Sequence, residues 1–117
     1  MSDSQVENTI PVLPVRDLDL SVEFFRETLG FDLEWKTPEI CSIARDGCSI
    51  MLQRRIDGSR ATVWIGLQDD SLYAKITGSG ATILQAPTRQ RWAYEMKIAD
   101  LDGNTLWLGT DPDDARG

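Results

Sequence analysis

The sequence contains no histidine among its 117 residues. Histidine is the commonest protein ligand of several transition metals and the usual general base near neutral pH. Its absence excludes catalytic triads that use an imidazole, and it leaves a divalent cation little but carboxylates to bind. The sequence therefore predicts no metal centre unless acidic side chains gather on one inner face, and we expect no cofactor.

Positive charge and long hydrophobic runs are also scarce. Twelve Lys and Arg side chains stand against 19 Asp and Glu side chains, so the net charge is −7. A surface of this sign repels phosphate backbones and anionic lipids, which argues against nucleic-acid and membrane partners. No apolar run approaches the ~18 residues of a membrane helix, and the polar start does not resemble a signal peptide. We expect a soluble, cytoplasmic protein whose partner is a neutral or cationic small molecule.

Cysteine occurs only twice, as Cys41 and Cys48 on either side of a predicted turn. The two thiols could face each other across a hairpin and form a disulfide. Two buried free thiols fit a cytoplasmic chain better. No spacing typical of a zinc finger is present.

The first half of the chain contains the signals of one strand, one helix and three further strands. Residues 9–17 are apolar but contain two prolines, which a sheet tolerates at an edge or a bulge. A helix follows at about 17–30, with Asp17 or Asp19 as its cap and Gly30 at its end. Its apolar stripe consists of Leu18, Val22, Phe25 and Leu29. The three strands are predicted at 31–37, 39–45 and 48–54.

The second half repeats this order. Its strand is predicted at 61–69, its shorter helix at 70–80, and its last strands at 81–87, 91–99 and 104–109. The hairpin "DGCSIML" (46–52) recurs as "DGNTLWL" (102–108), with an Asp-Gly turn in each copy. We therefore predict an α+β fold of tandem βαβββ modules, module one at about 9–54 and module two at about 61–110. The single domain would span residues 1–117, with a flexible tail at 111–117.

Two stretches carry a resemblance to a known family. They are "PVLPVRDLDLSVEFFRETLGFDLEW" (11–35) and "WAYEMKIADLDGNTLWL" (92–108). With the tandem modules, they make the chain similar to the vicinal oxygen chelate superfamily of glyoxalases, bleomycin-resistance proteins and dioxygenases. The resemblance covers about residues 9–110 and implies that the two modules form a curved, mixed-sheet cup.

The resemblance also implies where a metal enzyme of this superfamily would hold its ligands. The corresponding positions here are Ile10, Met51, Thr62 and Trp107, with Gln53 beside Met51 on the same face. None of these four is a credible ligand of a divalent cation. Metal-dependent glyoxalase or dioxygenase activity is therefore not expected.

Side-chain alternation along the strands predicts what lines the cup instead. The predicted ligand-binding residues are Trp64, Trp107, Met51, Gln53 and Thr62, joined by Trp92 and Tyr94 near the terminal hairpin. A mostly apolar concave surface with a few polar groups is typical of small-molecule sites. The tryptophans could equally fill the space between sheets or bury a dimer interface.

Several functions fit these residues. The resemblance to the bleomycin-resistance branch implies a metal-free homodimer that sequesters a planar ligand, which could be cationic, between aromatic side chains, as in antibiotic resistance. The alternative is a metal-independent isomerase or lyase that uses Glu95 as its base and Tyr94 as a donor. A purely structural dimer is the third. We expect a homodimer in each case, because open sheet edges and an apolar cup are commonly closed by a second copy.

Overall fold

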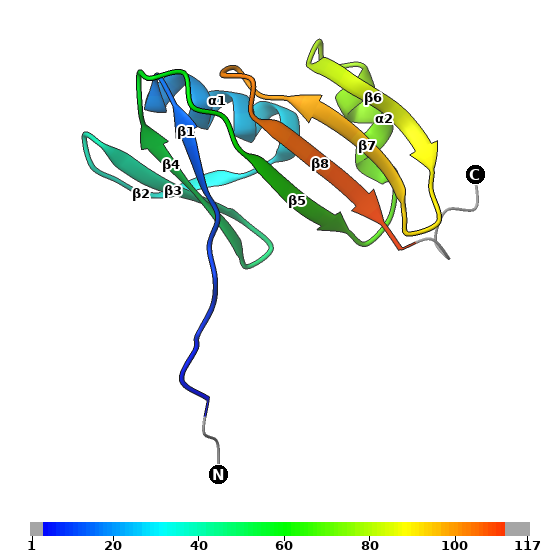
Figure 1. Cartoon of the computed structure of the whole chain (residues 1–117), viewed down its shortest axis with the longest axis horizontal. Helices are drawn as coiled ribbons and strands as arrows, with labels where there is room; N and C mark the ends of the chain where they lie inside the picture. The colour runs from blue at the N-terminus through cyan, green and yellow to red at the C-terminus, as the bar shows by residue number, and fades with distance from the viewer. Residues whose placement is uncertain (1–3, 112–117) are drawn as a thin grey trace.

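A computed structural model describes residues 4–111, in which two βαβββ modules follow one another (Figure 1). Module one consists of β1 (Val12–Val15), α1 (Leu18–Leu29), β2 (Asp32–Lys36), β3 (Ile40–Arg45) and β4 (Cys48–Arg54). Module two consists of β5 (Thr62–Leu67), α2 (Ser71–Thr77), β6 (Thr82–Arg89), β7 (Tyr94–Ala99) and β8 (Thr105–Thr110). The predicted α+β repeat is confirmed, although β7 begins three residues later than expected. Most of the predicted tail, residues 112–117, lies outside the described part of the chain.

Each module forms a four-stranded mixed sheet with the same topology. The strand orders are β1-β4-β3-β2 and β5-β8-β7-β6, and in both sheets the first strand runs parallel to the last one. Val12 is opposite Met51 in the first sheet, and Trp64 is opposite Trp107 in the second. Pro14 lies on an edge strand, as predicted, where a residue without an N–H group breaks no central ladder.

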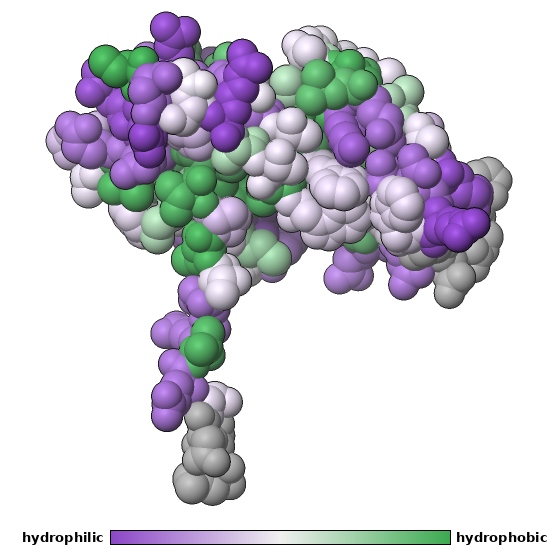
Figure 2. All heavy atoms as spheres, in the orientation of Figure 1, coloured by the Kyte–Doolittle hydropathy of each residue, from purple (hydrophilic) through white to green (hydrophobic). Residues whose placement is uncertain are grey.

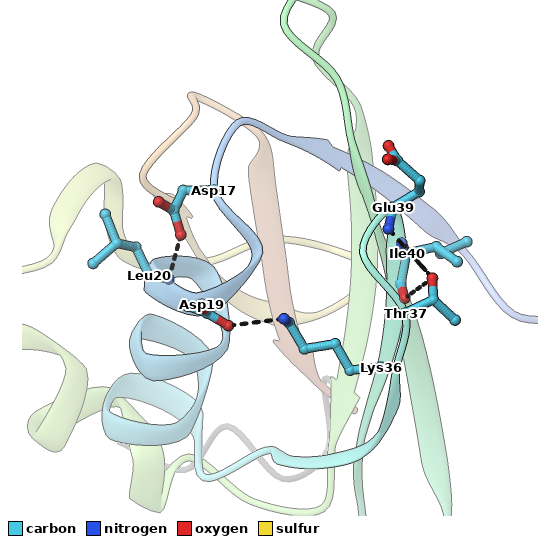
Figure 3. Close-up of polar contacts among 7 residues, drawn as sticks. All are labelled: Asp17, Asp19, Leu20, Lys36, Thr37, Glu39 and Ile40. Carbon is cyan, nitrogen blue, oxygen red and sulfur yellow. Dashed lines mark hydrogen bonds and ion pairs between the residues drawn. The ribbon is translucent and has the colours of Figure 1, made fainter.

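Helix α1 forms because its sequence supplies both caps and one apolar face. The Asp17 carboxylate accepts a hydrogen bond from the Leu20 N–H group at 2.9 Å, so Asp17 rather than Asp19 is the cap (Figure 3). Asp19 instead pairs with Lys36 of β2 at 3.2 Å, which ties the helix to the strand that follows it (Figure 3). Gly30 ends the helix with φ at 74°, a conformation that other residues adopt at a cost.

Both helices pack against the same side of the sheets, and the other side of each sheet stays open. Alternate strand residues of both modules join the helices in one continuous core, which includes Phe25, Ile43, Met96 and Leu106. The molecule measures only 22 Å along its shortest axis, the thickness of one sheet layer and one helix layer. In the orientation of Figure 1 the helices lie behind the sheets, and residues 4–11 project away from the body as an extended arm.

The turn before β8 joins the two modules. Asn104 is fully buried, and its amide donates to the Pro14 carbonyl of β1 and to the Asp100 carboxylate, both at 2.8 Å. Its side-chain oxygen accepts from the Ala61 N–H group at 2.8 Å. The Arg16 N–H group donates to Asp102 at 3.1 Å. The Asn104 side chain therefore satisfies backbone groups of module one and of the connection between the modules, and it also binds a carboxylate of its own turn.

The cysteines are both free, but only Cys41 is buried. The expectation of two buried thiols is wrong for Cys48, because this residue opens β4 directly after an exposed turn. None of the helices in the described part of the chain has the length and apolar character needed to cross a membrane.

Candidate functional site

The open side of the second sheet carries a pair of tryptophans. Trp64 of β5 and Trp107 of β8 are ladder partners, so their side chains leave the same face of the sheet. Their ring centroids are 5.2 Å apart, and their planes meet at 83°, an edge-to-face contact. Trp107 is partly buried, whereas Trp64 remains 47% exposed. We call the surface formed by Trp64, Trp92, Glu95, Lys97 and Trp107 the tryptophan face.

Two glycines make room for the Trp64 ring. Gly66 and Gly109 are ladder partners, two residues beyond Trp64 and Trp107. A Cβ atom at Gly109 would lie 2.2 Å from Cη2 of Trp64, and one at Gly66 would lie 3.3 Å from its Nε1. The indole therefore lies over bare backbone, which brings it down against the sheet instead of out into solvent.

Glu95 of β7 holds the other two tryptophans in place. Its Oε1 atom accepts from the indole N–H groups of Trp92 at 2.7 Å and Trp107 at 2.9 Å, and its Oε2 atom accepts from the Gln85 amide at 2.9 Å. Only 1% of Glu95 is exposed. Burial alone would raise the pKa of this carboxyl, but the three hydrogen bonds and the nearby Lys97 charge outweigh burial and lower the pKa. Glu95 is therefore a buried carboxylate that orients indoles.

Lys97 completes the tryptophan face. It is the ladder partner of Trp107 on one side and of Gln85 on the other, so it shares their face. Its Nζ atom lies 4.7 Å from the centroid of the Trp107 ring, within the range of a cation–π contact. The polar side of this face thus contains one buried anion and one partly exposed cation.

The predicted residues of module one lie on the other sheet. Met51 is partly buried on β4, and Gln53, two residues further on, is exposed. The open side of this sheet also carries Glu34, whose Oε1 atom accepts from the hydroxyls of Ser42 at 2.7 Å and Ser49 at 2.9 Å. Glu34 is exposed, and its hydrogen bonds link three strands.

The structure brings some of the predicted residues together and separates others. Trp64, Trp107, Thr62 and Trp92 all belong to the open side of the second sheet, and Trp92 is 58% exposed. Tyr94 does not join them. Its ring lies 5.4 Å from that of Tyr73 on α2, because Tyr94 precedes Glu95 directly and successive strand residues point to opposite faces.

Tyr73 explains why Tyr94 is held on the helix side. The Tyr73 hydroxyl donates to the Tyr94 carbonyl at 2.6 Å. Burial, with smaller effects of nearby Tyr94, Asp70 and Glu95, raises the pKa of Tyr73 to about 12, so this donor stays protonated. Tyr94 and Glu95 therefore cannot act together on one ligand in the open cup.

The residues at the superfamily's ligand positions do not fit a divalent metal. Ile10 precedes β1, Thr62 opens β5, and Met51 and Trp107 lie on the two last strands. An alkyl chain, a hydroxyl, a thioether and an indole offer no carboxylate or imidazole donor for a hard cation. Over residues 4–111, no three Cys, Asp or Glu side chains gather where they could share an ion.

Sequence reasoning missed two residues of these surfaces. Lys97 could have been found, since it follows Glu95 by two residues on one strand and must share its face. Gln85 could not, because it lies beside a register shift in its ladder. A β-bulge changes which side chains share a face, and the alternation pattern does not reveal where it occurs.

The geometry described above is that of a tandem βαβββ protein with an aromatic surface on its open sheet. A family model described as the Glyoxalase/Bleomycin resistance protein/Dioxygenase superfamily matches residues 8–108. The chain therefore belongs to this superfamily, as the two quoted stretches indicated. The comparison with curated proteins found no match.

Solved structures of similar fold include three whose descriptions mention antibiotics. TnmS3, an antibiotic binding protein from Streptomyces sp. CB03234, is 25% identical with a TM-score of 0.78, over 95% of this chain and 98% of that chain. A bleomycin resistance determinant encoded on the transposon Tn5 is 23% identical with a TM-score of 0.80, over 91% and 98% of the two chains. The bleomycin-binding protein of bleomycin-producing Streptomyces verticillus, complexed with copper(II)-bleomycin, is 20% identical with a TM-score of 0.77, over 92% and 98%.

Proposed function

We propose that this protein binds a planar small molecule on the tryptophan face, without a metal and without transforming it. The observation that carries the proposal is the Trp64–Trp107 pair, two indoles in edge-to-face contact at 5.2 Å on an open sheet. Trp64 is 47% exposed to solvent, although its ring lies over glycine backbone. An ordered but accessible aromatic ring is suited to stacking on a flat ligand, because little conformational entropy remains to be lost on binding.

Relatives of known structure support ligand binding as the class of function. Proteins described as binding an antibiotic or bleomycin share the fold over nearly the full length of both chains. The positions at which metal enzymes of the superfamily hold their ion carry no fitting donors here. The proposal concerns planar ligands of any charge. If such a ligand is an antibiotic, its sequestration would confer resistance.

The proposal includes a homodimer, because no element within residues 4–111 covers the open sides of the sheets. Large apolar side chains remain exposed on them, among them Val12 and Trp35, each at 44%. Figure 2 shows hydrophobic residues gathered around β1 and β4, at the root of the extended arm. A second copy can close an open cup on both chains at once, since a twofold contact uses the same surface twice.

The alternative function, a metal-independent isomerase or lyase, gains no support from the contacts of Glu95. A general base must be free to accept a proton from substrate, at a pKa near the working pH. Glu95 is buried, already accepts three hydrogen bonds and has a lowered pKa. Its predicted donor, Tyr94, packs against Tyr73 behind the sheet.

The experiment that tests the proposal is a titration with 1-pyrenemethanol, a neutral planar probe whose emission is sensitised by nearby tryptophan. We expect saturable binding that survives a chelator, and a loss of affinity of at least tenfold in Trp64→Leu. Phe24→Leu is the matched control, since it removes an aromatic ring from α1, on the helix side. The proposal fails if the probe does not bind, or if it binds both variants as well as the original protein.

A further inference from the structure

Lys97 supplies the positive charge of the tryptophan face. Its ammonium lies 4.7 Å from the centroid of the Trp107 ring. Because it is the ladder partner of Trp107 and of Gln85, it comes from the middle of the second sheet and cannot swing to the helix side. The π face of Trp107 that a cationic ligand would use already holds the protein's own cation.

The ammonium of Lys97 is the accessible charge of this face, and the carboxylate is not. Over residues 4–111, Lys97 belongs to none of the ion pairs, which involve Arg26, Lys36, Arg45 and Arg55. The nearest acid on its own strand face is Glu95, whose oxygens accept from Gln85, Trp92 and Trp107 and which is 1% exposed. A ligand on the open side therefore meets ammonium N–H donors and does not meet the carboxylate.

For a ligand that stacks on the tryptophans, the ammonium of Lys97 has a stronger electrostatic effect than the net charge of −7. Exposed charges farther away than about 8–10 Å are screened at ordinary ionic strength, whereas a charge in contact with the ligand is screened much less. An acidic surface attracts cations to the protein in general, but a cation that used the π face of Trp107 would have to displace Lys97.

We propose that Lys97 makes the tryptophan face selective for planar molecules that carry an anionic or strongly accepting oxygen at the ring edge, and that it disfavours cations. A carboxylate, phenolate or carbonyl oxygen of a ligand stacked on Trp64 would accept a hydrogen bond from the ammonium. The inference rests on the proposed function and names the chemical class of its ligand.

Three matched probes test it by the same sensitised emission: 1-pyrenecarboxylate, 1-pyrenemethanol and 1-pyrenemethylammonium. We expect the carboxylate to bind at least fivefold more tightly than the ammonium compound. Lys97→Met should weaken the binding of 1-pyrenecarboxylate about tenfold, as expected for the loss of a hydrogen bond to a charged group. It should also abolish the preference for the carboxylate over the ammonium compound. Lys97→Arg should keep it. Lys75→Met, which removes the same charge from exposed α2, should behave like the original protein.

The outcomes separate this inference from the function on which it rests. If the ammonium compound binds as tightly as the carboxylate, or if the preference survives in Lys97→Met, the role of Lys97 is refuted while planar-ligand binding stands. If none of the three probes binds, both proposals are refuted. Near-ultraviolet circular dichroism of Lys97→Met checks that the Trp64–Trp107 contact is retained.

Discussion

At the residue scale, the orientation of the tryptophans depends on neighbours that are not aromatic. Gly109 leaves the space in which the Trp64 ring lies, and Glu95 accepts the indole N–H groups of Trp92 and Trp107. Each of these contacts can be removed by a substitution that replaces none of the tryptophans. The two substitutions therefore test the arrangement of the indole rings while the number of tryptophans stays the same.

We expect Gly109→Ala to displace Trp64 while the protein remains folded. The new methyl carbon would lie 2.2 Å from Cη2 of Trp64, so the partly exposed ring must swing outward. The free energy of unfolding should fall by about 1 kcal/mol, the low end of the cost of overpacking. Near-ultraviolet circular dichroism should lose the Trp64–Trp107 signal. Gly78→Ala, which meets only ordinary contacts, is the control, and an unchanged spectrum in Gly109→Ala would contradict the packing described.

Glu95→Gln should lower the free energy of unfolding by about 1.5–3 kcal/mol at pH 7, because the indole N–H groups keep only a neutral acceptor and the Gln85 amide loses its acceptor. The folded pKa of Glu95 lies below its ordinary value of 4.5. Its stabilising contribution is therefore present above pH 4.5 and is lost as the pH falls through the folded pKa. Chemical denaturation from pH 7 to pH 3 should show the difference between the two proteins shrinking below pH 4.5.

The control for this pH dependence is Glu23→Gln, an exposed acid on α1. Its stability should follow that of the original protein at each pH. A difference between Glu95→Gln and the original protein that stays constant from pH 7 to pH 3 would rule out the described role of the carboxylate.

At the scale of elements, the two Asp-Gly hairpins are similar in sequence but make different contacts. The turn before β4 is exposed and connects β3 to β4, with both Asp46 and Gly47 at positive φ. The turn before β8 contains Asn104, which bonds β1 and the connection between modules. Asp100, which also holds this turn, is mostly buried, and burial raises its pKa in spite of the hydrogen bonds that it accepts.

Asn104→Ala is therefore expected to cost about 2–3 kcal/mol of unfolding free energy, since the Pro14 carbonyl and the Ala61 N–H group lose a buried partner. Hydrogen exchange should report faster opening at Ala61 before any change in β3. Asn8→Ala, the same substitution on the exposed arm, should leave stability unchanged. Equal stability of the two variants would show that Asn104 does not join the modules.

At the scale of the whole molecule, sheets with one open side predict self-association. Sedimentation equilibrium should report twice the chain mass of 13.1 kDa. Trp35→Asp should shift the equilibrium toward the monomer, because a charge on a closed apolar face would be buried without a partner. Leu20→Asp, on exposed α1, should remain dimeric. A monomeric original protein would refute the dimer and leave ligand binding to be judged by the pyrene titration.

The sequence alone was sufficient for the repeat and for the faces of β4, β5 and β8, whereas Tyr94 of β7 was assigned to the wrong face. The order of strands and helices follows from apolar periodicity, glycine and proline, and these are local properties of the chain. Leu106 and Leu108 are buried and Trp107 faces the open side, as the alternation within β8 predicts. The absence of histidine, together with Ile10, Met51, Thr62 and Trp107 at the superfamily's ligand positions, could also be read directly.

Tertiary structure alone determined what each polar group does. Glu95 was a candidate base in the sequence and is a buried acceptor in the fold, because its three donors come from β6, β8 and the loop before β7. Lys97 lies over Trp107 because β7 pairs with β8 in one particular register. Strand register, β-bulges and side-chain burial are long-range properties, because they depend on segments that meet only when the chain folds.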